Sequence, residues 1–112
     1  MSAFTLDPKP TFKMTVQVPI PGEGFAPLEL TCKYRNKTER KEFADSVFSA
    51  EDGDVNVKMD DVQILKEIIV GWNIADKCTP ENIEKLAENY PTVPSIVYID
   101  YMSELGKVRE KN

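Results

Sequence analysis

The sequence predicts an α+β fold, an N-terminal antiparallel β-hairpin packed on a small bundle of about four helices. Two segments near the N-terminus alternate apolar and polar residues with the two-residue period of a half-buried strand. The rest of the chain carries apolar residues at helical spacing, and capping residues, Gly and Pro divide it into segments. Because a two-stranded hairpin is marginal alone in water, we expect the helices to cover its apolar face.

The strands are expected at residues 11–18 and 28–35, where apolar and polar side chains alternate. Residues 19–27 separate them, and this segment contains three prolines and two glycines. It is therefore predicted to be a projecting loop, too long for a tight turn. Residues 1–10 show no periodicity and are expected to be an extended lead-in to a single domain formed by residues 11–112.

Two helices are expected after the hairpin. Asn36 and Glu39 have the spacing of a capping box, so the first helix should begin there and run to about residue 50, where residues 51–54 break it. The apolar residues between positions 62 and 72 cover a broad helical face, which predicts a second helix at the centre of the core. Residues 71–76 should end this helix.

Two further helices are expected in the C-terminal part. Thr79 reads as an N-cap followed by Pro80 at the first helical position, and Pro91 should end this third helix. Pro94 can open a fourth helix that reaches about residue 108. The core side chains expected on these helical faces are Phe43, Val47, Leu65, Ile69, Trp72, Leu86, Tyr90 and Tyr101.

Partner-binding residues are expected on the fourth helix. Ile96 and Ile99 lie beside its polar side, away from the apolar face, and such an off-face pair often marks a second contact surface. Burial on two sides of the helix is an equally good interpretation of this pair. Trp72 and the tyrosines are open to a similar choice between core packing and interface anchoring, and core packing is favoured.

Composition narrows the function classes. The 112 residues carry a net charge of -5 with pI near 4.8, which makes direct nucleic-acid binding improbable. No apolar run approaches membrane-spanning length and residues 1–9 lack the core of a signal peptide, so a cytoplasmic protein with no membrane partner is expected. Histidine is absent from the sequence, which removes the commonest general base and transition-metal ligand.

No catalytic, cofactor or metal site is predicted. The acidic residues between positions 51 and 60 are spaced like a calcium loop, but the required Gly and Glu positions hold Val57 and Gln63. A solvated loop between helices is therefore predicted there. Cys32 and Cys78 fit no metal spacing and are interpreted as buried thiols. Without a paired carboxylate cleft, a serine–histidine pair or a phosphate-binding loop, the protein is not expected to be an enzyme.

The sequence also resembles a known family. Its strongest part is the stretch from Gly71-Trp72-Asn73 to Tyr90-Pro91, and pieces of the N-terminal strand and loop agree. The residues that carry the resemblance are Phe4, Leu6, Pro10-Thr11-Phe12, Val16, Val18-Pro19, Gly22, Asp61-Val62, Ile68-Ile69-Val70, Thr79-Pro80-Glu81-Asn82-Ile83, Leu86, Asn89, Ile96, Tyr101, Leu105-Gly106 and Lys111-Asn112. In these pieces the chain resembles the tail assembly chaperones of long-tailed bacteriophages and prophages.

The resemblance implies a small non-enzymatic protein of the bacterial host cytoplasm that is absent from the mature virion. Such proteins bind the tape measure protein and help recruit tail tube subunits around it. Many are made in two lengths by a ribosomal frameshift. Because Glu110-Lys111-Asn112 can be encoded by a run of adenines, we expect a frameshifted longer companion.

Two other functions are alternatives for this sequence. An acidic inhibitor that mimics DNA and blocks a host enzyme would need dense rows of carboxylates, and a basic cluster interrupts any such row. A structural subunit retained in the particle would need extensive self-association. The basic cluster consists of Lys33, Arg35, Lys37, Arg40 and Lys41.

Overall fold

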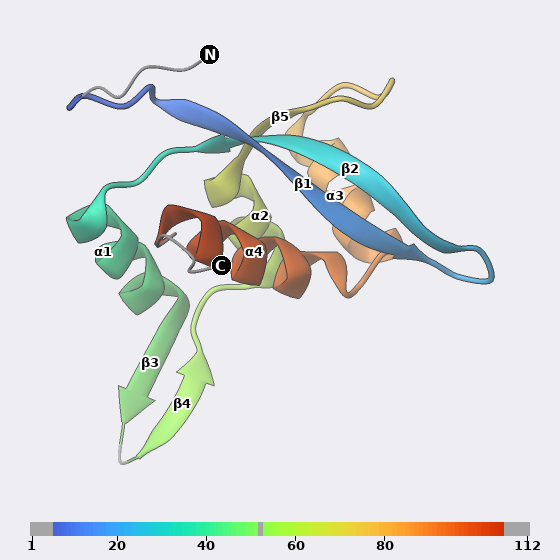
Figure 1. The fold of residues 1–112 in the computed structure, drawn as a ribbon. Helices are drawn as coiled ribbons and strands as arrows, with labels where there is room; N and C mark the ends of the chain where they lie inside the picture. The colour runs from blue at the N-terminus through green and yellow to red at the C-terminus, as the bar shows by residue number, and fades with distance from the viewer. Residues whose placement is uncertain (1–5, 52, 107–112) are drawn as a thin grey trace, which may run out of the picture.

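The computed structural model describes residues 6–51 and 53–106. The α+β class is confirmed, because an N-terminal antiparallel hairpin is followed by four helices, with short extra strands between them (Figure 1). In chain order the elements are β1 (Thr11–Ile20), β2 (Gly24–Lys33), α1 (Lys37–Val47), β3 (Phe48–Glu51), β4 (Asp54–Val57), α2 (Asp61–Ile68), β5 (Ile69–Trp72), α3 (Pro80–Asn89) and α4 (Val93–Leu105).

The first hairpin is longer than the sequence predicts. β1 and β2 pair without interruption until Ile20 faces Gly24, so the projecting loop expected at residues 19–27 is mostly strand. Pro19 lies on edge strand β1, and Pro27 lies where β2 has only β1 beside it, so neither missing N–H breaks a central ladder. Gly22, at φ +78°, allows the tight turn that closes the hairpin.

The second predicted helix is wrong in its C-terminal part. α2 ends at Ile68, and the next four residues form β5, which pairs antiparallel with β2 in a sheet of order β1-β2-β5. Ile69 and Trp72 are therefore strand residues. The β-branched residues Ile69 and Val70 favour the strand here.

The segment between α1 and α2 also differs from the prediction. α1 ends at Val47 rather than near residue 50, and β3 and β4 form a second antiparallel hairpin where a solvated loop between helices was expected. Gly53, at φ +84°, lies in the connection between these strands. In Figure 1 this hairpin extends away from the sheet and the helices.

The predicted helix starts are confirmed. Asn36 caps α1 by accepting from the Glu39 N–H at 2.9 Å, and the Glu39 carboxylate accepts from the Asn36 N–H at 3.0 Å. Thr79 caps α3 through its hydroxyl, with Pro80 in the first turn. α4 begins at Val93, and its predicted extension to residue 108 lies outside the described residues.

The core lies between the inner face of the three-stranded sheet and the helices, with α4 beneath the sheet (Figure 1). Alternate residues of β1 and β2 are buried, including Val16 and Leu30. Of the predicted core residues, five are buried and three are half-buried against the core. The buried ones are Phe43, Val47, Leu65, Ile69 and Tyr101, and the half-buried ones are Trp72, Leu86 and Tyr90.

Arg35 departs from the predicted exposed basic cluster, because it is buried at 7% exposure just past the end of β2. Its guanidinium lies 4.1 Å from the centroid of the Phe43 ring and donates to the Glu67 carboxylate and carbonyl and to the Tyr101 hydroxyl. The Tyr101 hydroxyl in turn donates to the Lys33 carbonyl at 2.6 Å. These bonds satisfy the buried charge and tie the end of the sheet to α2 and α4.

Within the described part of the chain, each helix is too short or too polar to cross a membrane.

Candidate protein-interaction surface

The β3–β4 hairpin has one apolar and one polar face. Phe48 pairs with Val57, and Ala50 pairs with Val55, so these four side chains share a face. Helix packing covers this face only at Phe48, and Val55 and Val57 are 71% and 63% exposed. Two exposed β-branched residues side by side on a projecting strand are a feature of surfaces that contact another molecule.

The apolar face of the hairpin continues onto α4. Phe48 packs edge-on against Tyr98 with ring centroids 5.4 Å apart, and Ile99 on the next position of α4 is 64% exposed. A hollow of about 170 Å³ separates the two elements. Its lining residues are Phe48, Val57, Asp61, Ile64, Pro94, Ser95, Tyr98 and Ile99. We call the apolar surface formed by Phe48, Ala50, Val55, Val57, Tyr98 and Ile99 the hairpin–helix patch.

The two isoleucines expected to bind a partner occupy different settings. Ile99 lines the hollow and belongs to the hairpin–helix patch. Ile96 is half-buried and packs against the core. The structure adds Val55 and Val57, which the sequence interpretation placed in a solvated loop. Their alternation after Asp52-Gly53 is the sequence signal that could have identified them, because Asp-Gly flanked by alternating residues is typical of a hairpin.

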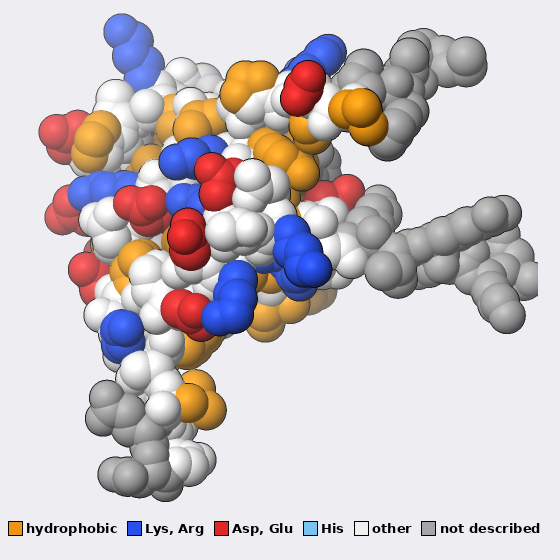
Figure 2. Space-filling model, turned by 90° about the vertical axis from the view of Figure 1, so that its left-hand side faces the viewer, with side chains coloured by type: hydrophobic (Ala, Val, Ile, Leu, Met, Phe, Trp, Pro, Cys, Tyr) orange, Lys and Arg blue, Asp and Glu red, His pale blue; other side chains and the backbone are white. Residues whose placement is uncertain are grey.

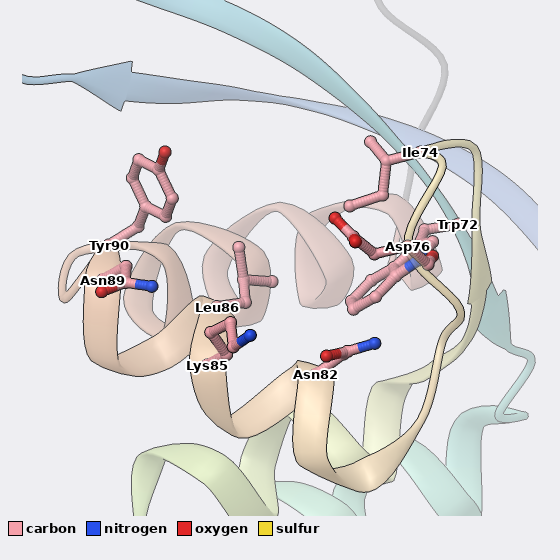
Figure 3. Close-up of a pocket in the computed structure, with 8 residues that line it drawn as sticks. All are labelled: Trp72, Ile74, Asp76, Asn82, Lys85, Leu86, Asn89 and Tyr90. Atoms are coloured by element: carbon pink, nitrogen blue, oxygen red, sulfur yellow. The ribbon is translucent and has the colours of Figure 1, made fainter.

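A second apolar hollow, of about 210 Å³, lies between α3 and the segment that follows β5 (Figure 3). Leu86 and Tyr90 reach it from α3, and Trp72 and the 44% exposed Ile74 reach it from the other side. The segment is held by the Trp72 indole N–H, which donates to the Asp76 carbonyl at 2.6 Å. The half-burial of Trp72, Leu86 and Tyr90 thus combines core packing with a wall of this hollow.

The two thiols are poor nucleophiles. Burial, with a smaller contribution from Glu104, raises the pKa of Cys32 to about 12, and burial also raises the pKa of the half-buried Cys78 thiol. Both side chains therefore stay protonated near neutral pH. Among the described residues no group of three His, Cys, Asp or Glu side chains is placed to hold a metal ion.

Charges of both signs are mixed on the side of the molecule that carries α1. Figure 2, which looks onto the left-hand side of Figure 1, shows Lys and Arg interspersed with Asp and Glu rather than rows of one sign. Lys41 and Asp45, one turn apart on α1, form an ion pair at 2.9 Å. The hydrogen bond to Asp45 raises the pKa of Lys41.

A small α+β fold that exposes a continuous apolar strip on a projecting hairpin has the features of a protein-binding module. The comparisons with known proteins identify the module. The chain belongs to the phage tail assembly chaperone family, whose sequence model matches residues 1–112. Searches of curated proteins and of solved structures find no match.

Proposed function

We propose that this protein is a non-enzymatic chaperone of phage tail assembly that binds the tape measure protein and helps recruit tail tube subunits around it. The family membership supports a role in tail assembly. The observation that carries the binding proposal is the exposed hairpin–helix patch, in which Val55, Val57 and Ile99 are each more than half exposed. Their burial requires a partner with apolar side chains of its own.

An amphipathic helix of the tape measure protein is the occupant we propose for the patch. Helices are recognised in apolar grooves through side chains that recur every three or four residues. The hollow between Phe48 and Ile99 accepts one such side chain, and the apolar face of the hairpin accepts the next. We propose that this contact, made through six side chains, is reversible, so that tube subunits can displace the chaperone as the tail grows.

The proposal places the protein in the cytoplasm of the bacterial host and outside the finished virion. It includes a longer companion made by frameshifting near Glu110-Lys111-Asn112, which lies outside the described residues. Mass spectrometry of purified virions tests the first part, because a chaperone should be absent while tube subunits are abundant. Detection of this chain at the copy number of a tail subunit would contradict it.

Binding to the patch is tested with the tape measure protein encoded by the same phage or prophage. Val57→Asp combined with Ile99→Asp should weaken co-purification about tenfold or more, because two carboxylates then enter an apolar contact. Val70→Asp is the control, since Val70 is 54% exposed and lies on β5 outside the patch. Circular dichroism should give the same fold for all variants. Unchanged binding by the double variant would reject the patch, and failure of the wild type to bind would reject the tape measure protein as partner.

A further inference from the structure

The side of α1 that faces away from Arg35 carries a basic stripe. Lys37, Arg40, Lys41 and Ala44 recur at the spacing that places side chains on one face of a helix. This face lies beside Met102 of α4, and a hollow of about 590 Å³ lies between the two helices. Its lining residues are Lys37, Thr38, Arg40, Lys41, Ala44 and Met102. We call this site the α1–α4 hollow.

The charge of the α1–α4 hollow is opposite to that of the protein as a whole. The chain has a net charge of -5, yet three cationic side chains line this hollow, and none of its described lining residues is acidic. One of the three, Lys41, also pairs with the neighbouring Asp45 at 2.9 Å. The Glu39 and Glu42 carboxylates of α1 belong to a different hollow, on the side of the helix that carries Phe43. The hollow therefore favours anionic groups.

Arg40 is the best-fixed of these cations. Its guanidinium lies against the C-terminal end of α4, where a Cβ added to Gly106 would be 2.7 Å from Nη2. Its Nε is buried, and among the described residues no acceptor is bonded to it. The two Nη groups of a planar guanidinium are suited to a carboxylate, which can accept two parallel hydrogen bonds from one such group.

The floor of the hollow is apolar. Ala44 and Met102 form this floor, and Met is a flexible side chain that adapts to different apolar partners. We propose that the α1–α4 hollow is a docking site for an acidic amphipathic segment of a partner protein. One apolar side chain of that segment packs on Ala44 and Met102, and its neighbouring carboxylates bind Arg40, Lys37 and Lys41. This site is separate from the hairpin–helix patch, and its occupation does not depend on the tape measure protein.

The test uses a synthetic helical peptide in which Leu and Glu recur four residues apart, together with a twin in which Gln replaces every Glu. Amide chemical shifts of the full-length protein report where each peptide binds. Lys37→Glu combined with Lys41→Glu reverses the charge at the rim of the hollow. Both side chains are exposed, so the fold should persist. Lys66→Glu combined with Lys85→Glu is the matched control, with the same change of net charge on α2 and α3.

We expect the Glu peptide to shift amides of residues 37–44 and 102, and the rim variant to bind it about tenfold more weakly while the control binds within about threefold of wild type. Raising the salt concentration should weaken binding as well. Equal binding of the Gln twin, shifts confined to other residues, or tighter binding of a single-stranded oligonucleotide at these residues would overturn the proposal. The Val57→Asp and Ile99→Asp variant should bind the peptide normally, which separates this result from the test of the tape measure contact.

Discussion

The two hairpins of this protein have the same alternating pattern and opposite environments. In β1–β2 the apolar face is buried, with Val16 at 1% and Leu30 at 0% exposure. In β3–β4 the apolar face is in solvent beyond the half-buried Phe48, with Val55 at 71% and Val57 at 63% exposure. The difference lies in what covers them, because β1–β2 packs on the helices while β3–β4 extends from the body (Figure 1).

The comparison separates two uses of the same pattern. On β1–β2 the alternation stabilises the fold, since the hydrophobic effect rewards each residue removed from water. On β3–β4 the same alternation leaves apolar area in water, and burial of this area is available to a second molecule. Mutations on the covered hairpin should therefore change stability, and mutations on the uncovered one should change binding.

Leu30→Ala and Val55→Ala provide the sharpest test of this difference. Leu30 is fully buried, and its truncation should lower the free energy of unfolding by about 3 kcal/mol because a cavity is left in the core. Val55→Ala should change it by less than about 0.5 kcal/mol, since the side chain is already in water. Urea unfolding of both variants measures the two changes in the free energy of unfolding. Similar losses for the two would show that the β3–β4 face is covered in solution.

Arg35→Lys tests the contacts that hold the end of the β1–β2 hairpin against the helices. Lysine keeps the charge but cannot reproduce the fork that bonds Glu67 and Tyr101 while stacking on Phe43. We expect a loss of about 2 kcal/mol in the free energy of unfolding, because buried acceptors lose their donor. Thermal and urea unfolding should agree on the loss. A change below about 0.5 kcal/mol would mean that charge alone matters at this position.

Cys32, on the buried face of β2, should make the protein sensitive to high pH. Its pKa is about 12 in the fold and near 9.0 in an exposed chain, so between these values the unfolded chain loses a proton that the folded chain keeps. The thiol's stabilising contribution is complete below pH 9 and falls as the pH rises toward 12, by at most about 1.4 kcal/mol per unit. The free energy of unfolding of Cys32→Ala should fall less steeply from about pH 9 to about pH 11.

Cys78→Ala is the matched control for this experiment. Its thiol is only half-buried, so the variant should keep most of the wild-type slope. If Cys32→Ala and the wild type lose stability in parallel above pH 9, the alkaline transition belongs to other groups.

Much of the fold could be predicted from the sequence where local chemistry and tertiary packing agree. The alternation of β1 and β2, the Asn36–Glu39 capping box and the Thr79–Pro80 start of α3 each have a local physical cause, and each is present in the structure. The loop predicted around Pro27 was wrong. A strand tolerates proline where no neighbouring strand needs its N–H, and this depends on how far β5 extends along β2, which tertiary packing decides.

The short strands escaped prediction because their apolar residues also fit a helical period. Ile69 and Trp72 extend the apolar face of α2 on a helical wheel, and only the β-branched run and Gly71 indicate the strand. Of the candidate surface, Ile99 was predicted from its position off the main helical face. Val55 and Val57 were missed because their exposure depends on a hairpin where the sequence was interpreted as a solvated loop.

The contacts of Arg35 set an order of events during synthesis. Its guanidinium is bonded by Glu67, which follows 32 positions later, and by Tyr101, which follows 66 positions later. A ribosome delivers the chain from the N-terminus, so this cation leaves the exit tunnel long before the groups that neutralise it. The end of the sheet therefore closes only after the last helix has emerged, and an arrested shorter product would leave this cation in water beside an open sheet end.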